Sequence, residues 1–251
     1  MSGAGVTSSR GQPRQALFQN VHVAAAVADT FLIVGLLIWL FRAGARAWLP
    51  RVGWSTLAVL VVDAGLGALQ QHGSSGPLAG TLHAWLAALL FAAVAAIALF
   101  TSSSWQREAE LVRDYGWPSL RFLSSTAAFL VAVQVGFGAG FRHSAVGVMP
   151  HLLGALVVAI FIIIVGAFVT TQFPKHASLR PMAVAFMTIT GIQVFLGMGA
   201  FLMRMMNTAG SLVFLTISVA HVATGSLTLA AGVMLAIEIR RGVLPRAQEA
   251  A

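Results

Sequence analysis

Residues 151–172 read HLLGALVVAIFIIIVGAFVTTQ, and this stretch contains no aspartate, glutamate, lysine or arginine. A helix needs roughly 20 apolar residues to cross the hydrocarbon core of a bilayer, so the stretch is long enough to span a membrane. Further apolar runs of comparable length occupy residues 22–41, 54–71, 83–100, 121–141, 182–203 and 212–238. The sequence therefore predicts an all-α polytopic membrane protein with about seven transmembrane helices.

The composition excludes most other classes of protein. Hydrophobic residues make up 58% of the 251-residue chain and charged residues only 9%, whereas soluble domains carry about a quarter charged residues. The chain contains no cysteine, so disulfides, zinc–thiolate sites, iron–sulfur clusters and covalent haem attachment are excluded. The net charge of +8 resides in the loops, which excludes a DNA-binding face and predicts no nucleic-acid partner.

The basic residues predict the orientation of the chain. The loops after the first, third and fifth spans, with the C-terminal tail, hold eleven of the fifteen: Arg42, Arg46, Arg51, Arg107, Arg113, Arg121, Lys175, Arg180, Arg240, Arg241 and Arg246. The opposite side holds Arg10, Arg14, Arg142 and Arg204. By the positive-inside rule, we expect the C-terminus in the cytoplasm and the N-terminus outside a cell membrane, with the bilayer as the chain's partner. The first apolar run is expected to be a span and not a cleavable signal.

The spans fall into a group of three and a group of four, separated by a longer polar loop. We expect an extracytoplasmic tail at 1–20, three spans within 21–105, a cytoplasmic loop at 106–120, four spans within 121–240 and a cytoplasmic tail at 241–251.

A repeat supports this division. The second, fourth and sixth spans carry Ala64-Gly-Leu-Gly-Ala68, Val135-Gly-Phe-Gly-Ala139 and Leu196-Gly-Met-Gly-Ala200, and a histidine lies on the next span each time. Such small-residue spacing is common wherever membrane helices pack closely, but its recurrence beside a histidine points to a shared site.

Four histidines lie on spans that descend from the outer face, namely His22, His83, His151 and His221. The residue four positions later is small in each case: Ala26, Ala87, Ala155 and Gly225. Position i+4 lies on the same helix face as i, so a flat porphyrin held by the histidine would lie over that small residue. Two imidazoles can ligate a b-type haem, and we expect one or two such haems near the outer face. The alternative is that each histidine is interfacial or hydrogen-bonded to a neighbouring helix.

Two segments resemble the heme A synthase family of cytochrome oxidase assembly proteins: Gln134-Val-Gly-Phe-Gly-Ala-Gly-Phe-Arg-His143 with Pro150-His-Leu-Leu-Gly-Ala-Leu-Val157, and His221-Val-Ala-Thr-Gly-Ser-Leu227. The resemblance covers nearly the whole membrane region. The family has two halves of four helices, each with one histidine pair. The resemblance therefore implies two pseudo-repeated bundles here, a first haem-binding half of three helices at 21–105 and a second haem-binding half of four helices at 121–240. His151 and His221 would form the pair of a complete second half, whereas His22 and His83 would belong to a first half without its first helix.

The chain departs from the family at the residues linked to catalysis. The family's glutamate three residues before the first histidine is Gln19 here, the arginine after that histidine is Val23, and the paired cysteines of many members are absent. We therefore expect a haem-binding protein, di-haem b, with an electron-transfer or respiratory-oxidase-associated role and with quinone or respiratory complex subunits as partners. An active synthase that oxidises the heme O methyl group is the first alternative. A haem-free transporter or membrane scaffold is the second.

Other polar residues allow two interpretations each. Asp29 and Asp63 are the only acids deep within the spans, and they form either a proton or quinone site or a neutral packing pair. Arg142 and Arg204 lie at outer helix ends, where they contact haem propionates or simply reach water. His143 and His176 lie in loops, and we expect them to be solvated.

Overall fold

The computed structural model describes residues 12–42, 46–71, 76–114, 117–208 and 210–245. Within these ranges, seven helices are long and apolar enough to cross a membrane. They are α1 (Gln12–Arg42), α2 (Leu49–Gln71), α3 (Pro77–Thr101), α5 (Leu120–Arg142), α6 (Val148–Gln172), α7 (Leu179–Met205) and α8 (Leu212–Gly242). The short elements are α4 (Ser103–Gln106), β1 (Val112–Arg113) and β2 (Val243–Leu244). The prediction of an all-α polytopic membrane protein is confirmed.

Several helices begin earlier than the apolar runs do. Helix α3 begins at Pro77, six residues before the predicted span, because Gly76 is extended and proline suits the first helical position. His83 consequently lies in the second turn of α3, about 9 Å along its axis. Helix α1 begins at Gln12, inside the segment expected to be a tail, and residues 1–11 lie outside the described part of the chain.

The chain divides into two compact units, Met1–Leu57 and Ala58–Ala251. The first unit contains α1 and the start of α2. Inside it, the side chain of Leu37 lies against Gly53, and the rings of Phe41 and Trp54 meet edge to face with 5.9 Å between centroids. The second unit contains the rest of α2 and every later element.

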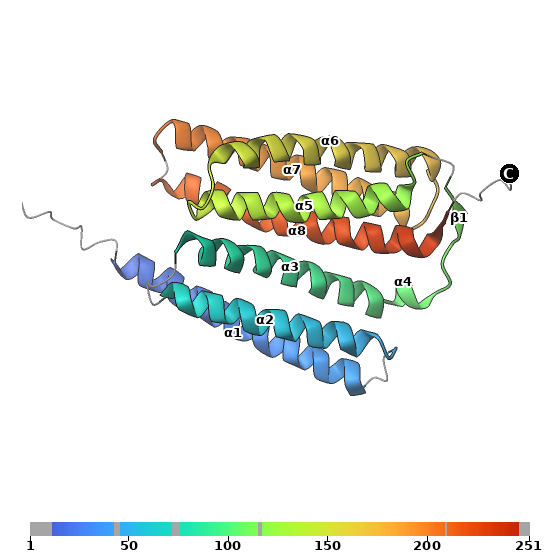
Figure 1. The fold of residues 1–251 in the computed structure, drawn as a ribbon, viewed down its shortest axis with the longest axis horizontal. Coiled ribbons are helices and arrows are strands. Elements are labelled where there is room, and N and C mark those ends of the chain that lie inside the picture. Colours follow the sequence, from blue (N-terminus) through green and yellow to red (C-terminus); the bar gives the residue numbers. More distant parts are fainter. Residues whose placement is uncertain (1–11, 43–45, 72–75, 115–116, 209, 246–251) are drawn as a thin grey trace, which may run out of the picture. The chain divides into compact units, whose positions relative to one another are not determined.

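Helices α5 to α8 form a four-helix bundle, as predicted for the second half of the chain (Figure 1). Each helix contacts the next, and α8 closes the bundle against α5, so α6 and α8 occupy diagonal positions. Helix α3 packs on the side formed by α5 and α8. Side chains that are fully buried between these helices include Leu120, Ile162, Phe186, Leu229 and Leu235. Large apolar side chains such as Phe195 point outward, which fits a protein surrounded by lipid.

A small polar junction joins the ends of α5 and α8. Strand β1, within the predicted cytoplasmic loop, pairs in parallel with β2, which follows α8. Buried Asp114 accepts a hydrogen bond from the backbone N–H of Leu120 at 2.6 Å, and Arg121 Nε donates to the carbonyl of Val243 at 2.7 Å. Strands of two residues leave no periodic pattern, so the sequence did not predict this junction.

Candidate functional site

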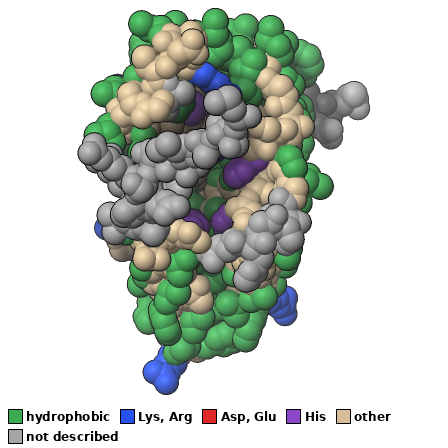
Figure 2. All heavy atoms as spheres, turned by 90° about the vertical axis from the view of Figure 1, so that its left-hand side faces the viewer, with side chains coloured by type: hydrophobic (Ala, Val, Ile, Leu, Met, Phe, Trp, Pro, Cys, Tyr) green, Lys and Arg blue, Asp and Glu red, His purple; other side chains and the backbone are tan. Residues whose placement is uncertain are grey.

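Histidine side chains gather at the end of the second unit where α3, α6 and α8 begin. Figure 2 looks onto this end of the molecule, and histidines are visible there among hydrophobic and polar side chains. His83 belongs to α3, His151 to the first turn of α6, and His221 to the third turn of α8. All three side chains are partly buried.

His151 and His221 face each other across the bundle. Their ring centroids are 6.1 Å apart and their ring planes are 82° apart. A metal–imidazole bond is about 2.0 Å long and the ring centre lies about 1.15 Å behind the bound nitrogen, so two imidazoles on opposite sides of one metal have centroids about 6.3 Å apart. Two aromatic rings in edge-to-face contact also have centroids about 4.5–7 Å apart. The separation thus fits a shared axial metal but also fits a direct ring contact.

Two of the three imidazoles have an acceptor on Nδ1. Nδ1 of His221 donates to the backbone carbonyl of Gln193 at 3.0 Å. Nδ1 of His83 lies 2.9 Å from Oδ1 and 3.1 Å from the carbonyl oxygen of Asp63, both of which accept. Metal-bound histidines almost always donate their second ring N–H in this way, because it fixes the tautomer and leaves Nε2 for the metal. Nε2 of His221 has no hydrogen-bond partner within the described residues.

His151 has a related partner, the side-chain amide of Gln134. The amide nitrogen donates to the carbonyl oxygen of His151 at 2.7 Å and lies 2.9 Å from its Nδ1, while the amide oxygen is buried and has no partner in the described part of the chain. Metal binding through Nε2 requires a proton on Nδ1. The amide of Gln134 can accept a hydrogen bond from a proton on Nδ1 only when the amide oxygen faces the ring. The two orientations of an amide are distinguished by hydrogen bonding alone.

Each ring also lies against a glycine of the preceding helix. A Cβ at that glycine would lie 3.1 Å, 2.9 Å or 2.8 Å from the Cε1 atom of the histidine in the pairs Gly67–His83, Gly138–His151 and Gly197–His221. Each glycine stands four residues after the residue that holds Nδ1: Asp63, Gln134 and Gln193. Because i and i+4 share a helix face, the polar group and the bare glycine together form one seat for the imidazole.

This arrangement corrects the alignment of the third repeat. The small-residue motif pairs Gly199 with Gly67 and Gly138, but the structure places Gly197 against the histidine. A Cβ at Gly199 would meet Ile217 at 3.6 Å, which is an ordinary contact. The signal that finds the correct register is an acid or amide followed by glycine at the fourth position, which sequence reasoning missed.

The small residues after the histidines have different surroundings. Gly225 is buried, and a Cβ there would lie 3.0 Å from Nε2 of Gln193, so its small size accommodates that amide. Thr224 Oγ1 donates to the amide oxygen of Gln193. Ala155 is half-buried and Ala87 is exposed. A position beneath a porphyrin remains a prediction for all of them.

His22, Ala26 and Asp29 belong to α1 and therefore to the first unit, where their side chains are exposed. A pair between His22 and His83 remains a prediction, and so does a proton shared between Asp29 and Asp63. In the second unit, Asp63 is 7% exposed and its carboxylate is held by the imidazole of His83.

The arginines and histidines of the loops complete the site. Arg204 places its guanidinium 4.9 Å above the ring of Phe141, and Arg142 is exposed at the end of α5; contact with propionates remains a prediction for both. His143, expected to be solvated, is half-buried against Gly80 of α3. Burial, and then the charges of Arg142 and His83, lower the pKa of His143.

The expectation of a solvated His176 is wrong, because its side chain is buried. Its Nδ1 accepts hydrogen bonds from the backbone N–H groups of Ser178 and Leu179, both at 3.2 Å, and so caps the start of α7. Free backbone donors at a helix start need such a partner, and a loop histidine can supply one.

No three His, Cys, Asp or Glu side chains of the described residues converge in a way that could hold a metal ion by themselves. A haem iron needs only two axial ligands from the protein, since the porphyrin provides the others. The fold and site define a polytopic α-helical membrane protein. Three histidines at one end of its second unit each lie against a glycine and a polar group of the preceding helix. Comparison of the chain with family models, with curated proteins and with solved structures found no match.

Proposed function

We propose that this chain holds a b-type haem between His151 and His221 and acts as a one-electron carrier in the membrane. The observation that carries the proposal is the 6.1 Å separation of the two rings on diagonal helices, close to the spacing of about 6.3 Å for two imidazoles on one iron. The hydrogen bond from Nδ1 of His221 to the carbonyl of Gln193 supports it, because a proton on Nδ1 leaves Nε2 of the neutral imidazole available for a metal.

A second haem at His83, with His22 as the other ligand, is part of the proposal. Its support is the repeat: His83 has the same relation to Asp63 and Gly67 that the other histidines have to their seats. An anionic acceptor on Nδ1 makes an imidazole a stronger donor to a metal.

Electron transfer is favoured over methyl oxidation for two reasons. When bound, a haem with two axial histidines supplies reversible one-electron chemistry. The residues of the chain hold and orient the imidazoles and exclude water from the bundle. At position 19, the family's carboxyl group is replaced by the amide of Gln19, which cannot serve as a base. We further propose a quinone or a respiratory complex as the redox partner.

The decisive experiment is a visible spectrum of the purified protein with pyridine-haemochrome quantification. We expect two b-type haems per chain with the sharp bands of six-coordinate low-spin iron. His143→Gln is the matched control, because His143 lies at the same end of the bundle but outside the proposed pairs. A folded preparation that binds no haem would overturn the proposal.

We also propose that the end with the most arginines faces the cytoplasm, as the positive-inside rule predicts. The chain has no cysteine, so single substitutions can report accessibility without background. Ala145→Cys, between α5 and α6, should react with an impermeant maleimide added outside cells, whereas Ala177→Cys, between α6 and α7, should react only after lysis. The opposite pattern would reverse the orientation.

A further inference from the structure

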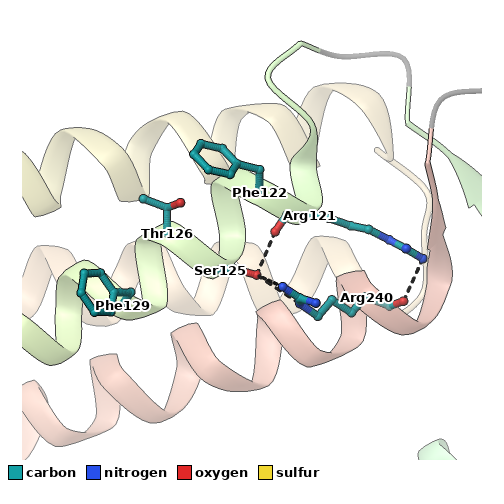
Figure 3. Close-up of a pocket in the computed structure, with 6 residues that line it drawn as sticks. All are labelled: Arg121, Phe122, Ser125, Thr126, Phe129 and Arg240. Atoms are coloured by element: carbon teal, nitrogen blue, oxygen red, sulfur yellow. Dashed lines mark hydrogen bonds between the residues drawn. The ribbon is translucent and has the colours of Figure 1, made fainter. Parts of the chain in front are cut away.

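A groove with a charged end and an apolar end lies on the surface between α5 and α8. It lies at the end of the bundle opposite His83, His151 and His221. Figure 3 shows the residues that line it, which are Arg121, Phe122, Ser125, Thr126 and Phe129 of α5 and Arg240 of α8. Arg121 is the second residue of α5, and Arg240 belongs to the last turn of α8. The groove therefore begins where both helices leave the membrane.

The two arginines are held in place but keep unused donors. Arg121 donates from Nε to the carbonyl of Val243 and from Nη2 to the carbonyl of Arg240 at 3.0 Å. Arg240 donates from Nε and Nη2 to Oγ of Ser125, at 3.2 Å and 3.1 Å (Figure 3). A guanidinium has five N–H donors, so each arginine has three left.

No carboxylate in the described part of the chain pairs with these two arginines. Among the described residues, neither Arg121 nor Arg240 forms an ion pair with a carboxylate. The hydrogen bonds hold both guanidinium groups in place. Because both arginines line the groove, two positive charges lie at this end of it. Such an arrangement favours an anion that can accept several hydrogen bonds at once, and phosphate is such an anion.

The other end of the groove is apolar. Phe122, Thr126 and Phe129 stand at positions i, i+4 and i+7 and so share one face of α5. Phe122 and Phe129 are 59% and 66% exposed, and Phe129 lies about 12 Å deeper along the helix than Arg121. An acyl chain carried by the same molecule as the phosphate could lie along these rings, whereas a soluble phosphate has no group that could contact them.

From this polarity we infer that the groove binds one anionic phospholipid, with its phosphate on Arg121 and Arg240 and an acyl chain along Phe122 and Phe129. The proposed orientation places this end in the cytoplasmic leaflet, where anionic lipids attract basic residues. The inference is independent of the haem proposal, because it concerns the opposite end of the bundle. A bound lipid would tie together the helix ends that β1 and β2 already join.

Native mass spectrometry of the delipidated full-length protein tests the inference. Phosphatidylglycerol and phosphatidylcholine with identical oleoyl chains are titrated separately, and sn-glycerol 3-phosphate is added as a competitor without chains. We expect the first phosphatidylglycerol to bind more tightly than phosphatidylcholine and to resist the soluble phosphate. Equal binding of both lipids would overturn the inference, and so would competition by glycerol phosphate at lipid concentration.

Arg240→Gln locates the site, with Arg180→Gln as the matched control. Arg180 is exposed at the start of α7, at the same end of the bundle. Its side chain makes no hydrogen bond or ion pair with the described residues. Loss of one charge near a membrane surface costs about fivefold in affinity, and only Arg240→Gln should show it for the first bound lipid. Arg240→Lys keeps the charge but loses the planar fork, so it should also bind more weakly than the wild type. Wild-type affinity in both Arg240 variants, or the same loss in Arg180→Gln, would overturn the assignment.

Discussion

Substitution of single glycines by alanine tests the histidine seats. An added Cβ would lie 2.8 Å from His221 in Gly197→Ala and 2.9 Å from His151 in Gly138→Ala. Carbon atoms pack at about 3.5–4.0 Å, so each imidazole would have to move by roughly 0.6–1.2 Å. The rings lie between packed helices.

A displacement of this size matters for ligation. Metal–ligand distances tolerate deviations of only about 0.2 Å, so the iron would lose its bond to the displaced imidazole or the two helices would have to separate. We therefore expect either variant to lose the haem between His151 and His221, or its low-spin spectrum. Alanine favours a helix over glycine by about 0.5–1 kcal/mol, so the loss would not come from helix propensity.

The repeat supplies matched controls two residues away. A Cβ at Gly199 would lie 3.6 Å from Ile217, and one at Gly136 would lie 3.5 Å from Trp85. Both are ordinary contacts, so Gly199→Ala and Gly136→Ala should keep the haem and its spectrum. Each control variant carries the same substitution on the same helix, two residues from the tested glycine. The tested and control positions differ in contact with the imidazole.

The assay is the haem-to-protein ratio from pyridine haemochrome, read with the visible spectrum and the thermal unfolding temperature of each variant. Full haem content with an unchanged spectrum in Gly197→Ala would refute the seat. Equal haem loss in Gly197→Ala and Gly199→Ala would show that close helix packing, and not contact with the ring, explains the glycines.

The remaining predictions concern ligands, potential and catalysis. His151→Ala and His221→Ala should each remove one haem of the proposed two, measured by haemochrome; loss of both haems from a folded variant would contradict the pairing. Asp63→Asn should raise the midpoint potential of the haem proposed at His83 by about 60 mV in a redox titration. The reason is that loss of a charged hydrogen bond to the imidazole is worth about 1.4 kcal/mol. An unchanged midpoint potential would contradict this prediction. Co-expression with a heme O synthase should yield little heme A, because Gln19 lacks a carboxyl group; abundant heme A on extraction would refute that.

The spans could be predicted because lipid imposes a simple rule on sequence. A segment such as 151–172 must be apolar along its whole length, and its limits are visible without any tertiary information. Its ends are less visible: α3 extends back to Pro77 because local backbone chemistry, and not hydropathy, sets a helix start.

The histidines could be predicted, but not what holds them. Which glycine faces a ring depends on how two helices are rotated and staggered, and Gly197 and Gly199 are equivalent in composition and nearly so in depth. The prediction that His176 is solvated is wrong for a related reason. A loop residue in the sequence can be a buried helix cap once the helices assemble, and only tertiary structure reveals its backbone partners.

The recurrence of the seat follows from where the imidazoles lie. Each ring is partly buried between helices, and burying a polar group without a hydrogen-bond partner costs free energy. The preceding helix supplies that partner in each case. An imidazole can approach that helix closely only where the residue one turn further on has no Cβ, which explains the glycine four positions after each partner.

The acceptors of His83 and His221 then differ in strength, although the seats are alike. His83 donates to the carboxylate and the carbonyl of Asp63, whereas His221 donates only to the carbonyl of Gln193. A charged acceptor forms a hydrogen bond about twice as strong as a neutral one and makes the imidazole a better electron donor. A more electron-rich ligand stabilises ferric over ferrous iron. The haem proposed at His83 should therefore have the lower midpoint potential, so an electron that enters there would move downhill to the haem proposed between His151 and His221.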